Sequence, residues 1–194
     1  MGMPALQGRR WTAREVRQLI EDAPLATPRY ELVDGELLVT PSPVGRHQRA
    51  VVGLVRALDD YVEAHGLGVV LTSPSDVELE AERLVQPDVY AMSWPEWNRL
   101  ATLGWPARNL LLAAEVLSPS SSRYDRVVKR PLYQAHVPEY WIVDLDARLV
   151  ERWRPNEERP EVLSQRLVWA PAGATESLEL NLELFFARVF RDQR

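Results

Sequence analysis

Residues 110–117, LLLAAEVL, form a continuous apolar run that a single charged side chain, Glu115, interrupts. An apolar run of this length predicts a strand that is buried on both faces of a sheet. The turn Ser118-Pro119-Ser120 follows, and residues 121–135 are expected to form a helix. This order of strand, turn and helix predicts a helix that packs back onto the strand before it.

The rest of the chain predicts further short strands and helices. Residues 11–20 predict a helix with a capping box from Thr12 and Glu15. Residues 30–39 predict a hairpin around Asp34-Gly35, in which Glu31 pairs with Leu38 and Val33 with Glu36. The other expected elements are a helix at 47–64, strands at 69–71, 76–79, 84–92, 140–144, 149–153 and 162–169, a connector at 94–108, and a last helix at 182–190 capped by Asn181.

These elements predict an α+β fold, close to α/β, in which helices flank a mixed β-sheet. The length of 194 residues fits a single domain over 1–194. We expect its parts to be an N-terminal helical arm (1–28), a core (30–153), and a C-terminal strand and helix (160–194).

The composition excludes several classes of protein. The chain has no cysteine, which excludes disulfides, a thiolate nucleophile and Cys-based zinc sites. No apolar run approaches the roughly 18 residues of a membrane span, and residues 1–10 lack the apolar segment of a secretory signal, so a cytoplasmic location is expected. The net charge of −5 argues against constitutive, sequence-blind binding of nucleic acid but leaves room for a local basic cleft.

Two acidic residues lie inside expected core strands, Asp88 in VQPDVYAM and Glu115 in LLLAAEVL. A carboxylate in a strand core is costly unless it is paired or binds a cation. Taken singly, each acid could belong to a buried salt bridge or a strand end. If the two strands are neighbours, their carboxylates can converge, and a hard divalent cation such as Mg²⁺ would relieve the repulsion between them.

Lys129 is the only lysine in the chain, whose other basic residues apart from histidine are all arginine. Ammonium is a compact point charge, unlike the broad guanidinium fork, and the helix after Glu115 could return it to that carboxylate. Two acids, a cation and an ammonium suit metal-assisted hydrolysis of a phosphodiester. The alternative is an exposed ion pair between Lys129 and Asp125, one helical turn away. Pro131 would either kink this helix or start a new helical segment.

The motifs and their order resemble the Uma-type family of restriction endonucleases, which is assigned to the PD-(D/E)XK nuclease superfamily. The resemblance covers about residues 30–153 and continues weakly to the last helix. It rests on YELVDGEL (30–37), HQRAVVGLV (47–55), QPDV (86–89), AAEVLSPSS (113–121), YDRVVK (124–129) with Tyr133, and VPEYWIVD (137–144).

The resemblance implies a restriction-endonuclease-like fold and a DNA endonuclease that depends on Mg²⁺ or Mn²⁺. Asp88 and Glu115 would be its catalytic metal ligands. The superfamily usually places its lysine two residues after the second acid, where this chain has Leu117, so the resemblance implies that Lys129 replaces it. Glu36 resembles an early acid that supplies a further metal or water contact, and His47 and Asp125 match polar positions of the family.

Three arginines beside Lys129 could grip phosphates or form a solvated helix face; they are Arg123, Arg126 and Arg130. His47 shares an apolar helical stripe, which favours a packed side chain over a base or ligand. The expected partner is DNA, bound transiently. Formation of a homodimer is a further possibility. The alternative function is an inactive nuclease-like scaffold for binding or assembly, which the acidic charge, the displaced lysine and Pro131 favour.

Overall fold

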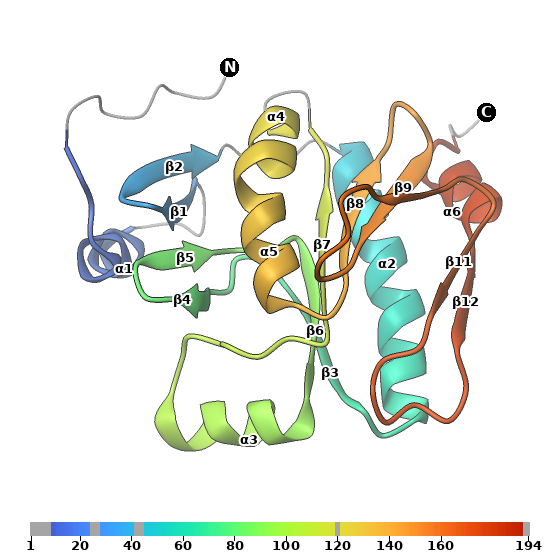
Figure 1. Cartoon of the computed structure of the whole chain (residues 1–194), viewed down its shortest axis with the longest axis horizontal. Coiled ribbons are helices and arrows are strands. Elements are labelled where there is room, and N and C mark those ends of the chain that lie inside the picture. The colour runs from blue at the N-terminus through green and yellow to red at the C-terminus, as the bar shows by residue number, and fades with distance from the viewer. Residues whose placement is uncertain (1–8, 24–27, 41–44, 119–120, 192–194) are drawn as a thin grey trace.

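A six-stranded mixed sheet forms the centre of the fold in the computed structural model, which describes residues 9–23, 28–40, 45–118 and 121–191 (Figure 1). The strands of this central sheet follow the order β10-β9-β8-β7-β6-β3. Their bounds are β3 Gly68–Thr72, β6 Val89–Ser93, β7 Leu112–Val116, β8 Tyr140–Asp144, β9 Leu149–Trp153 and β10 Glu161–Leu163.

Strand β7 confirms the prediction from the apolar run, because all five of its residues are buried. It pairs antiparallel with β6 and parallel with β8. Parallel neighbours need a crossover connection, and the helical segments α4 Ser122–Tyr124, η1 Asp125–Lys129 and α5 Arg130–His136 supply it. The expected α+β fold, a mixed sheet flanked by helices, is therefore present.

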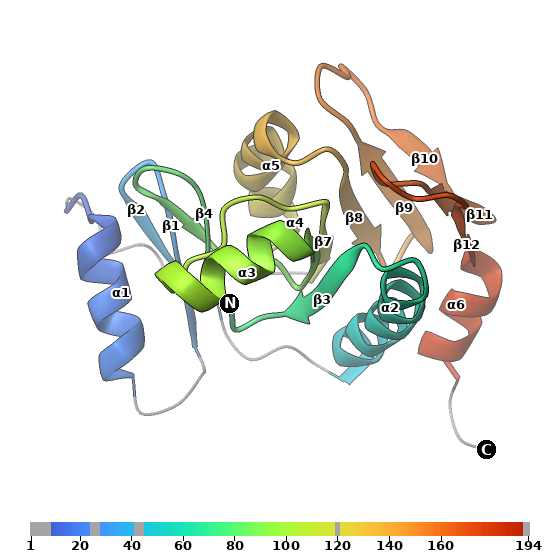
Figure 2. The ribbon, with the colours of Figure 1, turned by 90° about the horizontal axis from the view of Figure 1, so that it is seen from below.

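Opposite faces of the central sheet pack against different helices, as Figure 2 shows for α2 and α5. Along β7, Leu112, Ala114 and Val116 belong to the core under α2 Gly45–Ala64, whereas Ala113 belongs to the core under α5. Successive side chains of a strand point to opposite faces. Glu115 therefore points to the α5 face, where the crossover helix lies.

A second sheet, with the order β2-β1-β5-β4, lies beside the central one (Figure 1). Its strands are β1 Arg29–Val33, β2 Glu36–Thr40, β4 Val77–Glu80 and β5 Arg83–Val85, and α1 Ala13–Asp22 packs on it through Ala13 and Val16. The hairpin prediction is confirmed, since Glu31 pairs with Leu38. The capping box of Thr12 and Glu15 is also present.

The remaining elements are α3 Trp94–Leu103, the two-stranded sheet of β11 Arg166–Trp169 with β12 Leu178–Asn181, and α6 Leu182–Val189. The side chain of Asn181 accepts a hydrogen bond from Leu184 N, which confirms the predicted cap. None of the described helices is long and apolar enough to cross a membrane.

Two expected strands were wrong in extent. The strand expected at 84–92 is divided between β5 and β6, which belong to different sheets. Pro87 has no N–H for a strand ladder, and Asp88 consequently lies at the junction instead of the middle of a strand. The strand expected at 162–169 is likewise divided into β10 and β11, and β12 was not expected.

The helix expected at 121–135 changes its pitch in the middle. Arg130 N–H donates to Asp125 O, five residues back, so η1 is a π-helical turn. Pro131 then lies in the first turn of α5, where a missing N–H is tolerated. Of the two predicted outcomes, Pro131 therefore starts a new helical segment.

The close pairing of β3 with β6 makes Gly68 intolerant of a side chain. A Cβ atom there would lie 1.9 Å from the carbonyl oxygen of Met92, a backbone atom that cannot swing away. Gly68→Ala should lower the free energy of unfolding by about 1–3 kcal/mol in urea titrations. Gly45→Ala is the matched control, because a Cβ there meets nothing within 4 Å. Equal midpoints for the two variants would contradict this packing.

Candidate functional site

The antiparallel register of β6 and β7 brings Asp88 to the end of β7. Val89 pairs with Ala114, and Val116 N–H donates to Asp88 Oδ2 at 2.9 Å. Asp88, directly before β6, is therefore held at the end of β7, the neighbouring strand that carries Glu115. The negative charge of Asp88 contributes to raising the pKa of Glu115, after the larger effect of burial.

Asp88 is held as a carboxylate by two further side chains from distant elements. Arg29 Nη1 on β1 donates to Oδ1 at 2.7 Å, and His47 Nε2 on α2 lies 3.0 Å from Oδ2. Burial opposes ionisation, but these contacts and the Val116 amide outweigh it and hold the pKa of Asp88 well below its usual range. Asp88 is therefore ionised, and both its oxygens are engaged.

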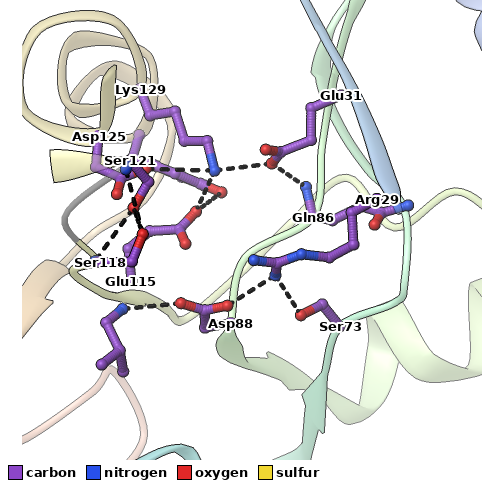
Figure 3. Close-up of polar contacts among 12 residues, drawn as sticks. Arg29, Glu31, Ser73, Gln86, Asp88, Glu115, Ser118, Ser121, Asp125 and Lys129 are labelled. Atoms are coloured by element: carbon purple, nitrogen blue, oxygen red, sulfur yellow. Dashed lines mark hydrogen bonds and ion pairs between the residues drawn. The ribbon is translucent and has the colours of Figure 1, made fainter. Parts of the chain in front are cut away.

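Lys129 reaches Glu115 from the opposite side of the site (Figure 3). Its Nζ lies 3.0 Å from Glu115 Oε1, 2.9 Å from Glu31 Oε1 and 3.5 Å from Asp125 Oδ1. Tyr133 OH also donates to Glu115 Oε1 at 3.1 Å. The expected return of Lys129 to the strand carboxylate is present, and the Asp125 contact exists as well, although it is buried instead of exposed.

The site holds more carboxylates than Lys129 can neutralise alone. Burial raises the pKa of Glu115 well above its usual range although Lys129 opposes the shift, and burial also raises the pKa of Asp125. The pKa of Lys129 is itself raised well above its ordinary value, because the carboxylates around it outweigh its burial. Lys129 is therefore a protonated side chain within a buried cluster of carboxylates. Such a cluster favours the binding of a further cation, or protons shared between carboxylates.

Glu31 and Arg29 have contacts at this site that the sequence analysis did not predict. Glu31 is fully buried in β1 and accepts from Gln86 N–H at 2.8 Å as well as binding Lys129. Glu36, the acid expected near the site, is exposed at the start of β2. The sequence contained one useful signal, because the hairpin pairing placed Glu31 on the same face as Val33.

The three arginines expected to bind phosphate differ in their surroundings. Arg123 is exposed. Arg126 binds Asp144 at 2.8 Å and Glu151 at 2.6 Å, and Arg130 lies 4.5 Å from the ring centroid of Trp153. Arg126 and Arg130 therefore already have structural contacts, and binding of phosphate by any of the three stays a prediction.

The described residues include no group of three or more His, Asp or Glu side chains that could hold a metal ion together. Mg²⁺ needs less, since it commonly binds one or two carboxylates and keeps several waters. One carboxylate oxygen of the cluster, Glu31 Oε2, is buried and has no hydrogen-bond partner within the described part of the chain. The oxygen-rich donors Asp88 and Glu115, with this unsatisfied oxygen nearby, fit a hard divalent ion.

Comparisons with known proteins identify the family and the fold. The family model Uma2, described as "putative restriction endonuclease", matches residues 15–184. The chain belongs to this family. A crystal structure of a putative nuclease belonging to DUF820 from Anabaena variabilis superposes with a TM-score of 0.73 at 22% identity, covering 90% of this chain and 98% of that one. A search of curated proteins finds no match. The fold is therefore that of the compared structure, and the family is the one described as "putative restriction endonuclease".

Removing the ammonium should destabilise the site strongly and in a pH-dependent way. Lys129→Met leaves buried carboxylates uncompensated, which should cost about 3–5 kcal/mol near neutral pH. Without Lys129 the pKa of Glu115 rises further, so the folded variant binds a proton that the unfolded chain lacks. The stability lost should therefore be partly recovered as the pH falls from about 7 to about 5.

Urea unfolding at both pH values measures this effect. Arg126→Met is the control, because its ion pairs are more accessible to water and should contribute about 1 kcal/mol or less. A deficit in Lys129→Met that stays constant or grows at low pH would contradict the charge arrangement.

Proposed function

We propose that the protein is a metal-dependent DNA endonuclease that hydrolyses phosphodiester bonds. The observation that carries the proposal is the contact of Lys129 Nζ with Glu115 Oε1, on the strand next to β6, which Asp88 directly precedes. Two acids and one ammonium suit metal-assisted phosphodiester hydrolysis. Cytoplasmic location and a homodimer stay predictions.

Asp88 and Glu115 would hold Mg²⁺ or Mn²⁺ together with water. When bound, the ion would lower the pKa of a coordinated water and polarise a phosphoryl oxygen. Lys129 already contacts Glu31, Glu115 and Asp125, so its role is to stabilise, through its positive charge, the negative charge that develops on the phosphate. Glu31 and Asp125 keep Lys129 protonated and fix the direction of its side chain.

Arg29 also has a role in the proposed reaction. Its guanidinium binds Asp88 Oδ1 and Ser73 Oγ, each at 2.7 Å, and its pKa is raised by Asp88, Glu115 and Glu31 against the effect of burial. A cation at Asp88 would compete with Arg29 for this oxygen. The guanidinium would then be available to a DNA phosphate, which it can bind through two parallel hydrogen bonds.

Cleavage assays test the proposed function. Purified protein should cut plasmid or single-stranded DNA with Mg²⁺ or Mn²⁺, and EDTA should abolish the activity. Asp88→Asn, Glu115→Gln and Lys129→Met should each lower the cleavage rate by about 100-fold or more. Asp59→Asn, an exposed acid on α2, is the matched control and should retain the rate of the unaltered protein. Cleavage that persists in Asp88→Asn would contradict these roles.

One observation favours the alternative of an inactive scaffold: both oxygens of Asp88 already have protein partners. A scaffold of this kind would bind no divalent ion at Asp88. Calorimetric titration with Mn²⁺ separates the two functions, since binding that is lost in Asp88→Asn contradicts the scaffold. Absence of both metal binding and cleavage would contradict the endonuclease.

A further inference from the structure

A pocket of about 440 Å³ opens beside the candidate site, between the end of α1, the start of β1 and the loop after β3. Pockets of roughly 300–1,000 Å³ are those in which proteins bind small molecules. The lining residues used below are Arg29, Tyr30, Asp76, Gln86 and Trp105. None of them was assigned a role by the sequence analysis.

The buried amide of Gln86 has an unfilled acceptor. Its side chain is 2% exposed, and Nε2 donates to Asp76 Oδ1 at 2.8 Å. Its Oε1 is buried and has no hydrogen-bond partner among the residues that the structure describes. A buried oxygen without a partner costs about 1–3 kcal/mol. Gln86 and Asp76 both line the pocket, so a ligand whose N–H donor reaches Oε1 would recover that energy.

Aromatic side chains supply the remaining recognition surface. Trp105 lines the pocket although 49% of its surface is exposed, and Tyr30 is half-buried there. Exposed aromatic rings beside polar groups are typical of sites where unpaired bases stack. A planar ligand with donors on its edge therefore matches both parts of the lining.

Arg29 connects this pocket to the proposed cleavage site. It lines the pocket and also donates to Asp88 Oδ1. Gln86 lies two residues before Asp88, and its backbone N–H binds Glu31 (Figure 3). A nucleotide whose base enters the pocket would have its phosphate near Arg29, next to the carboxylate proposed to hold the metal.

We propose that this pocket binds one unpaired nucleobase with an exocyclic amino group, adjacent to the phosphate that is cut. The identification of the ligand as a nucleotide, instead of another planar molecule, rests on the proposed nuclease function. Gln86 Oε1 and Asp76 accept hydrogen bonds from the amino group. Thymine has no amino group, and its one N–H donor, N3–H, lies between two carbonyl oxygens that would face these acceptors, so thymine is disfavoured.

Calorimetric titration of the full chain with dAMP, dCMP, dGMP and dTMP in the presence of Mg²⁺ tests the pocket; these mononucleotides have no phosphodiester bond that could be cut. The three amino-bearing nucleotides should bind about tenfold or more tightly than dTMP, because a site built to accept hydrogen bonds from an amino group rejects a base that lacks it. Gln86→Met should remove this discrimination, and Trp105→Ala should weaken binding of all four nucleotides by a similar factor.

Trp94→Ala is the matched control, since Trp94 is a comparably exposed tryptophan that does not line the pocket. Equal affinity for all four nucleotides, no binding, or the same loss in Trp94→Ala as in Trp105→Ala would overturn the proposal. Selective binding by a chain that cuts no DNA supports the pocket and contradicts the proposed function. Cleavage of DNA by a chain that binds no nucleotide in the pocket supports the proposed function and contradicts the pocket proposal.

Discussion

The buried ammonium of Lys129 is the constraint on which the candidate site depends. Its three carboxylate partners come from three elements, since Glu31 lies on β1, Glu115 on β7 and Asp125 on η1. Buried charges of this kind are tolerated only when each is compensated. The ammonium of Lys129 therefore connects the second sheet, the central sheet and the crossover helix, close to the place where Asp88 is also held.

The position of Lys129 follows from the route of the chain after β7. A parallel neighbour, β8, requires the helical crossover, and the crossover covers the face to which Glu115 points. The π-helical turn ends at Lys129, and Pro131 begins the next helical segment instead of interrupting a regular helix. Lys129 thus reaches Glu115 from the helix, while Leu117, two residues after Glu115, packs in the core.

The sequence predicted those parts of the site that depend on local patterns. The apolar run identified β7 and Glu115, and the lone lysine identified Lys129. Glu31 and Arg29 escaped prediction because their burial depends on how the second sheet meets the central sheet, a long-range contact that periodicity does not encode. The division of residues 84–92 between two sheets escaped for a similar reason, although Pro87 marked the place.

Because the chain has a single lysine, one NMR signal can test whether the Lys129 ammonium is buried and compensated by carboxylates. Protein labelled with ¹⁵N at the lysine side chain should give one Nζ resonance, which is absent from Lys129→Met. We expect an ammonium that is protected from exchange with water and stays protonated when the pH is raised beyond 10.5, the ordinary pKa of lysine. Titration of this resonance at or below that pH would contradict the account.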